Sequence, residues 1–227
     1  MDTKIPTKKS KDKSLWSRLR KAQYVFMKES LNQKFEGVTM LDIGSGASQF
    51  EDLYKSFKKT AIDFAPYEGT DIIHDLEKGL PFENDVYDIV VSTNTFEHIY
   101  TVKDLISECY RVTKKGGFLI GSTPFQLCVH QEPYDYFRYT PFALERMMSD
   151  AGYSDIVIVS LGTHNQLVEQ TVDHFFASQQ NIKNSFLVRI LWKLSKILQK
   201  ITILVLGEST TSRKHTLGYG FIAKKLK

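Results

Sequence analysis

The chain has 227 residues, of which 42% are hydrophobic and 25% charged, as expected for one globular domain of ordinary size. Residues 1–21 carry eight basic and two acidic side chains, a net of +6, whereas the whole chain is +4, so residues 22–227 net −2. A slightly acidic body argues against nucleic acid as a partner. Two cysteines without a CxxC motif exclude a disulfide framework, and the lack of an apolar leader or of an 18-residue apolar run predicts a cytoplasmic protein with no membrane-spanning helix.

The N-terminal part divides into two segments. Residues 1–13 are rich in lysine, which predicts a flexible basic arm. From residue 15 to residue 31 apolar side chains recur at intervals of three and four, which predicts an amphipathic helix. Residues 14–227 are then expected to form a single domain.

Patterns typical of strands and of helices alternate along the rest of the chain. Apolar runs predict strands at residues 38–43, 59–64, 71–75, 87–92, 118–122, 155–161 and 217–224. Helices are predicted at 48–57, from about 95 to 112 and at 140–150, the second of them ended by the Lys-Lys-Gly-Gly sequence at 114–117. Because most of the strands are continuously apolar, we expect a parallel sheet that is covered on both faces.

A polar side chain stands at or near the end of each of the first four predicted strands. These side chains are Asp42, Asp63, Asp75 and Asn94. Parallel sheets bind ligands beyond the carboxyl ends of their strands, so we expect the four residues to lie along one edge, here called the rim.

The segment MLDIGSGASQF, residues 40–50, places a turn at this rim. Gly44 and Gly46 allow the backbone to approach a ligand closely. At the end of the second strand, the Asp63 carboxylate can accept hydrogen bonds from both hydroxyls of a ribose. Gln49 stands where a dinucleotide fingerprint has its third glycine, which argues against a pyrophosphate. The rim therefore predicts an adenosine-containing ligand.

Five segments together resemble the class I S-adenosylmethionine-dependent methyltransferases. They lie within residues 36–161 and read, in order, MLDIGSGASQF, AIDF, HDLEKGLPF, YDIVVSTNTFEHI and ECYRVTKKGGFLIGSTPF. The resemblance implies an α/β fold with a seven-stranded, mostly parallel, doubly wound sheet of order 3-2-1-4-5-7-6, in which strand 7 is antiparallel. To this fold the chain would add the N-terminal helix and a helical insert before the last strand.

The same resemblance implies that S-adenosylmethionine is the cofactor and assigns residues to it. Its methionine part would lie against Gly44, Ser45, Gly46 and Asn94, with Asp42 at the ammonium group, whereas Asp63 would bind the ribose, and Phe64, Asp75 and Leu76 would surround the adenine.

The segment HQEPYDYFRYTP, residues 130–141, follows the fifth strand and resembles the H-x-x-P-x-D-Y-x-R-[YF]-T segment of a subset of these enzymes. The predicted acceptor-side residues are Tyr134, Tyr136, Arg138 and Tyr139. Arg138 either pairs with Asp135 to hold the loop or binds an anionic group of the substrate.

Histidine has the ordinary pKa that suits a general base, so His130 is the first candidate for this role and His98 the second. The alternative is that both only brace the backbone. The other four histidines, at positions 74, 164, 174 and 215, have no ligand-like spacing, and no metal is expected.

The insert at residues 163–216 contains a strongly apolar stretch at 186–206. Within it Arg189, Lys193, Lys196 and Lys200 recur at helical intervals, which predicts a basic amphipathic helix. Such a helix either contacts a membrane surface, a second copy of the chain or an apolar substrate, or packs on the core with its basic stripe in solvent.

These observations predict transfer of a methyl group to oxygen of a small molecule, a glycan or a lipid-linked intermediate, in the cytoplasm or at a membrane. The alternatives are methylation of nitrogen or carbon in a small molecule, and a non-catalytic scaffold that keeps the cofactor fold.

Overall fold

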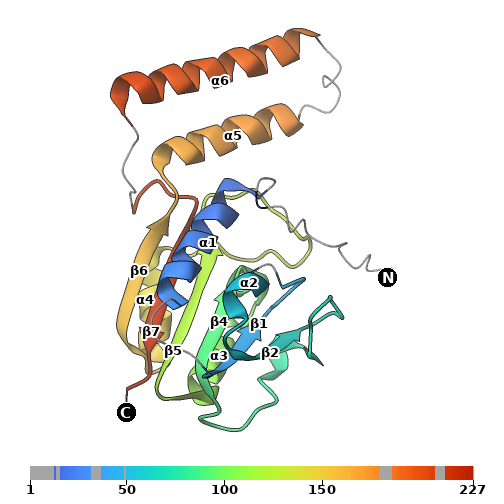
Figure 1. The fold of residues 1–227 in the computed structure, drawn as a ribbon, viewed down its shortest axis with the longest axis vertical. Helices are drawn as coiled ribbons and strands as arrows, with labels where there is room; N and C mark the ends of the chain where they lie inside the picture. Colours follow the sequence, from blue (N-terminus) through green and yellow to red (C-terminus); the bar gives the residue numbers. More distant parts are fainter. Residues whose placement is uncertain are drawn as a thin grey trace.

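The computed structural model describes residues 13, 16–31, 37–48, 50–178, 186–207 and 213–226. Residues 1–12 of the basic arm predicted at 1–13, and Gln49, lie outside the described residues. The fold is a seven-stranded sheet with helices on both faces and a pair of helices at one end (Figure 1).

The strands are β1 (Thr39–Ile43), β2 (Lys58–Asp63), β3 (Ile72–Ile73), β4 (Tyr87–Thr93), β5 (Thr113–Pro124), β6 (Ser154–Leu161) and β7 (Gly218–Lys224). Their order in the sheet is β3-β2-β1-β4-β5-β7-β6. The first five strands run parallel, and β7 is antiparallel to both β5 and β6. The predicted fold class and strand order are therefore confirmed.

Two layers of helices explain why the strands are apolar at successive positions. Leu41 of β1 and Val90 of β4 face a core that includes α3 (Val102–Val112) and α4 (Pro141–Asp150). Their neighbours Met40 and Ile89 face the opposite core, which includes α1 (Arg18–Leu31) and α2 (Glu51–Tyr54). Since side chains alternate between the faces of a strand, a sheet covered on both sides requires apolar residues at every position.

Several boundaries differ from those that the sequence predicted. The predicted helix from residue 95 to 112 is split into a short 3-10 helix, η3 (Phe96–His98), and α3. The residues at 114–117 that were expected to end this helix belong instead to β5. The cause is a contact with a distant segment. Gly116 N–H donates to the Lys225 carbonyl at 2.7 Å, and Lys225 N–H donates to the Gly117 carbonyl at 2.9 Å, so the pairing of β5 with β7 continues into these residues.

The predicted insert contains α5 (His164–Ser178) and α6 (Phe186–Leu206), the second with the bounds that the sequence predicted. Figure 1 shows α5 next to the sheet and α6 beyond it, so α6 forms the outermost layer. None of the helices among the described residues has the length and hydropathy required to cross a bilayer.

Candidate functional site

The turn after β1 is shaped by two glycines in the left-handed region of φ. Gly44 has φ +65°, and a Cβ atom there would overlap the Thr95 side chain, whose hydroxyl donates to the Ile43 carbonyl at 3.1 Å. Gly46 has φ +51°, and its N–H donates to the Asp63 carboxylate at 2.8 Å. The turn is thus held against β2 and β4, and its backbone lies at the rim.

Asp63 ends β2 as the sequence predicted. It is 3% exposed and also accepts a hydrogen bond from Ala65 N–H at 3.3 Å, so its carboxylate is oriented by the backbone on both sides. The next side chain, Phe64, is 63% exposed, which leaves its ring free to contact a planar group.

Asp42 lies next to the glycine turn and is 5% exposed. Burial raises the pKa of its carboxyl to about 7, and Lys59 partly opposes this shift. A cavity of about 30 Å³, the size of a small polar group, is lined by Asp42, Gly44 and Ser45, together with Phe50, Tyr54 and Thr93. The Ser45 hydroxyl is buried there without a hydrogen-bond partner. The cavity therefore offers an acid and an unused hydroxyl to the polar end of a ligand.

Asp75 and Leu76 start the short helix η2 (Leu76–Lys78). The Asp75 side chain caps this helix by accepting from Glu77 N–H at 3.1 Å, and it remains half exposed. Leu76 is 5% exposed and belongs to the core. Asp75 thus has a structural task in addition to the predicted contact with adenine.

Asn94 follows β4 with φ +53°, and its side chain is paired with Gln23 of α1. Gln23 Nε2 donates to Asn94 Oδ1 at 2.6 Å, and Asn94 Nδ2 donates to Gln23 Oε1 at 3.2 Å. Gln23 is 1% exposed. The sequence pattern did not identify this residue, because it predicted only an amphipathic helix over residues 15–31 and no role for its polar side chains.

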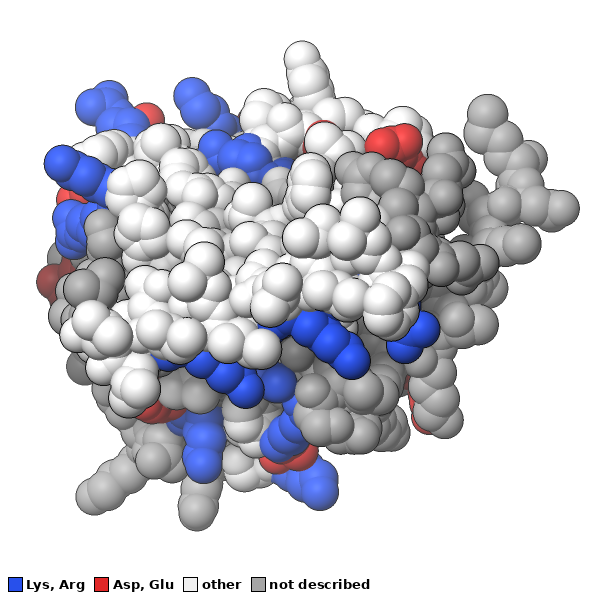
Figure 2. All heavy atoms as spheres, turned by 90° about the horizontal axis from the view of Figure 1, so that it is seen from above, with Lys and Arg blue, Asp and Glu red and all other residues white. Residues whose placement is uncertain are grey.

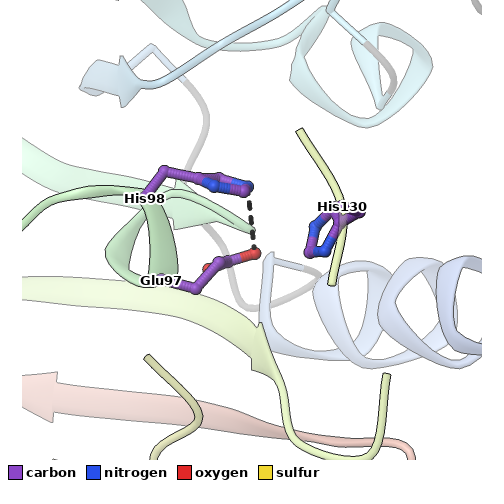
Figure 3. Close-up of side chains that lie close together, drawn as sticks. All are labelled: Glu97, His98 and His130. Carbon is purple, nitrogen blue, oxygen red and sulfur yellow. Dashed lines mark ion pairs between the residues drawn. The ribbon is translucent and has the colours of Figure 1, made fainter. Parts of the chain in front are cut away.

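The side chains of Glu97 and His98, both in η3, lie close to that of His130 (Figure 3). A carboxylate oxygen of Glu97 and one ring nitrogen of each histidine all lie within 4.8 Å of one another. Burial raises the pKa of Glu97 to about 8 and lowers the pKa of His98. These two histidines are the two that the sequence singled out, but their proximity to each other could not be seen in their spacing.

The loop after β5 brings His130 to this place. The Asp135 carboxylate accepts a hydrogen bond from the backbone N–H of His130 at 2.8 Å and two from the Arg138 guanidinium, at 2.7 and 2.8 Å. Arg138 also donates to the Leu127 and Cys128 carbonyls. The guanidinium holds the pKa of Asp135 well below its usual range. Arg138 thus forms the predicted pair with Asp135 that holds the loop, and its role toward an anionic substrate stays a prediction.

The predicted tyrosines occupy two different environments. Tyr134 and Tyr136 are 56% and 41% exposed. Tyr139 is buried, donates its hydroxyl hydrogen to the Phe96 carbonyl at 3.0 Å and lines a groove of about 370 Å³ with Tyr100 and Phe137. The backbone N–H groups of Tyr136 and Phe137 donate to the Glu97 carbonyl, so the aromatic loop is attached to η3.

Comparison with known proteins gives a consistent result. Residues 29–121 match the family model described as a methyltransferase domain. A Mycolicibacterium smegmatis protein named "Probable S-adenosylmethionine-dependent methyltransferase" is 27% identical over 124 residues, 50% of this chain and 47% of that protein. The ubiquinone biosynthesis O-methyltransferase of Paramagnetospirillum magneticum is 28% identical over 109 residues, 42% of this chain and 44% of that protein. The matched stretch therefore covers less than half of either relative.

Among solved structures, the phosphoethanolamine N-methyltransferase 2 of Haemonchus contortus, in complex with S-adenosyl-L-methionine, superposes with a TM-score of 0.56 at 18% identity. The superposition covers 90% of this chain and 52% of that one. The fold is therefore the Rossmann-like fold of the methyltransferases, and residues 29–121 carry the sequence features of a methyltransferase domain.

Proposed function

We propose that the protein is an S-adenosylmethionine-dependent methyltransferase that acts on oxygen of a small molecule, a glycan or a lipid-linked intermediate. The observation that carries this proposal is the rim, where the glycine turn, Asp63 and the polar cavity beside Asp42 lie together. The matched methyltransferase-domain model and the cofactor bound to the structural neighbour support it.

Each part of the rim suits one part of the cofactor. The cavity beside Asp42 and the unpartnered Ser45 hydroxyl would take the ammonium group of the methionine. Asp63, fixed by Gly46 and Ala65, would accept hydrogen bonds from the ribose hydroxyls. The exposed ring of Phe64 would cover the adenine. The bound sulfonium then supplies a methyl group for in-line displacement by the acceptor.

The acceptor would enter beside His130, His98 and the exposed Tyr134 and Tyr136. The aromatic loop would contribute shape and exclude water, with the two histidines close to the acceptor oxygen. Correct alignment of the two reacting groups supplies much of the rate in such a transfer. The curated O-methyltransferase among the relatives supports oxygen as the target, and nitrogen is the alternative that the structural neighbour suggests.

Calorimetry with S-adenosylhomocysteine tests the cofactor site. The intact protein is expected to bind it, and Asp63→Ala should weaken binding at least about tenfold, because two hydrogen bonds to a charged group are lost. Glu145→Ala, which removes an exposed acid from α4, is the matched control and should bind as the intact protein does. Failure of the intact protein to bind would refute the proposal.

The acceptor is found by supplying cofactor with an isotopically labelled methyl group to metabolite and lipid extracts. Mass spectrometry of the labelled product then locates the methyl group on oxygen, as proposed, or on nitrogen.

We further propose that α6 contacts an anionic membrane surface. Its outward side exposes a set of aliphatic side chains, here called the apolar face: Leu187, Ile190, Leu191, Leu194, Ile197, Leu198, Ile201, Leu204 and Val205. An exposed apolar patch of this extent marks an interaction site rather than ordinary surface. Figure 2 shows this side of the molecule as a broad uncharged area with a row of lysine and arginine side chains along one edge.

The charges favour a membrane over a second protein subunit. Arg189, Lys193 and Lys200 are exposed on α6. Lys196 is the exception, because its Nζ lies 2.6 Å from Asp173 and holds α6 on α5. A helix with an apolar face bordered by cations lies in the interface of an anionic bilayer, with the cations among the headgroups.

A further inference from the structure

The Glu97–His98–His130 cluster contains three side chains that can bind a metal ion, whereas a general base requires only one titratable group. Among the described residues it is the one group of three metal-ligand side chains whose donor atoms all lie within 4.8 Å of one another. Glu97 and His98 come from η3, and His130 comes from the loop after β5 (Figure 3). Both segments follow the carboxyl ends of parallel strands, as does the glycine turn.

The Glu97 carboxylate is incompletely satisfied. The side chain is 0% exposed, and one oxygen, Oε2, accepts from the Thr123 hydroxyl at 3.3 Å. The other oxygen, Oε1, is buried with no hydrogen-bond partner. A buried acidic oxygen without a donor is costly, and such a group in a folded protein points to a missing proton, water or cation.

The His98 ring presents a lone pair to this oxygen. Its Nδ1 lies 2.6 Å from the Tyr134 carbonyl oxygen, which can only accept a hydrogen bond, so this tautomer carries its hydrogen on Nδ1. The other nitrogen, Nε2, is buried without a partner and lies 3.7 Å from Glu97 Oε1. When Glu97 is ionised, as a bound cation requires, two acceptors therefore face each other at 3.7 Å, which is too long for a direct hydrogen bond and suits a cation in place of the carboxyl proton.

The His130 ring is oriented by a carboxylate. Its Nδ1 lies 3.1 Å from Asp135 Oδ2 and 3.4 Å from Arg138 Nη2. In the tautomer that carries its hydrogen on Nδ1, toward Asp135, Nε2 has the lone pair that a metal requires. A histidine that binds a metal through one ring nitrogen commonly donates the N–H of the other to a carboxylate. The Asp135 carboxylate, which accepts two hydrogen bonds from Arg138, offsets the positive charge of that guanidinium near the cluster.

We propose that Glu97, His98 and His130 bind a divalent first-row transition-metal cation. Two imidazoles and one carboxylate, with other positions open, suit zinc, iron, cobalt, nickel or manganese better than calcium or magnesium. Ligand atoms around one such cation lie roughly 3–3.5 Å apart, since the metal–ligand bonds are about 2.0–2.2 Å long. Small side-chain rotations would bring the cluster to this spacing.

An open position on the cation would hold the acceptor oxygen and lower the pKa of its hydroxyl. The acceptor would lose its proton to solvent, its oxygen would bond to the methyl carbon, and the carbon–sulfur bond would break with its electron pair left on sulfur. This role rests on the proposed methyl transfer, whereas the binding of the metal does not.

The test is titration of chelator-treated full-length protein with Co²⁺, followed by visible absorption, and with Zn²⁺, followed by calorimetry. One equivalent is expected to bind to the intact protein. Glu97→Gln and His130→Ala should each weaken binding more than about 100-fold, because each removes a direct ligand. His164→Ala removes a histidine outside the cluster and should leave binding unchanged.

Two measurements keep the result interpretable. Thermal unfolding establishes that Glu97→Gln, which is nearly isosteric, remains folded. S-Adenosylhomocysteine is titrated into the same samples, so loss of the cofactor site is distinguished from loss of the metal. Absence of stoichiometric metal binding in protein that binds S-adenosylhomocysteine would overturn the metal site. Equal binding by the intact protein and both cluster variants would also overturn it.

Discussion

Burial of Asp42 has a measurable consequence for stability. In the folded protein without ligand the pKa of this carboxyl is raised to about 7, whereas its ordinary value is 3.8. The proton is therefore bound more tightly in the folded state. The stabilising contribution of protonated Asp42 is fully present below the unfolded-state value and is lost as the pH rises through about 7.

We predict that Asp42→Asn removes this pH dependence. The free energy of unfolding of the variant relative to the intact protein should rise by about 2–3 kcal/mol between pH 5 and pH 7, at roughly 1.4 kcal/mol per pH unit, and then level off. Urea denaturation of both proteins without ligand, at a series of pH values, measures this difference in the free energy of unfolding. Glu97, whose pKa is also raised, titrates in both proteins and cancels in the difference. A difference that does not change with pH would contradict the prediction.

The residues whose positions could be predicted from local sequence are those at the end of a strand or in the turn that follows it. Gly44 and Asp63 could be predicted because the end of a parallel strand determines where the next residues lie. The contact between Gln23 and Asn94, separated by 71 positions, could not be predicted, because no local spacing encodes it. The same holds for the proximity of His130 to Glu97, which depends on the folded loop held by Asp135 and Arg138.

At the scale of elements, α1 is fixed to the rim by the Gln23–Asn94 pair. We predict that Gln23→Ala lowers the free energy of unfolding by about 1–3 kcal/mol, because the partly buried Asn94 amide loses both partners. Affinity for S-adenosylhomocysteine should fall as well, since Asn94 is no longer oriented. Urea denaturation and calorimetry measure the two effects.

The control for this prediction is Glu29→Ala on the exposed side of the same helix, which should change stability by less than about 0.5 kcal/mol. If Gln23→Ala were as stable as this control, the pair would contribute nothing to the attachment of α1.

Helices and strands could be predicted where the apolar pattern extends over many residues. Their ends could not be predicted where pairing with a distant segment determines them. The bounds of α6 followed from its sequence alone, because 21 residues of helical pattern leave no ambiguity. The start of β5 did not, since Gly116 and Gly117 are typical of a helix end and become strand only through their pairing with Lys225.

At the scale of the whole molecule, the sheet and the rim form one unit and α6 lies outside it (Figure 1). The side of α6 that contacts α5 includes Lys196 and Trp192, whose ring N–H donates to Asp173 at 3.2 Å. The apolar face points away from the protein (Figure 2). Any partner that covers this face lies outside the described part of the chain, and under the proposed function a bilayer would also supply a lipid-linked acceptor.

We predict that the protein sediments with vesicles that contain phosphatidylserine and does so less as the salt concentration rises. Lys193→Gln together with Lys200→Gln should weaken binding about 30-fold, since each cation contributes about 1 kcal/mol near an anionic surface. Lys103→Gln on α3 removes an exposed cation elsewhere and should have little effect. Leu194→Asp with Leu198→Asp should abolish binding, because both leucines lie on the apolar face. Protein that stays in the supernatant and forms dimers in sedimentation equilibrium would show that a second copy covers this face instead.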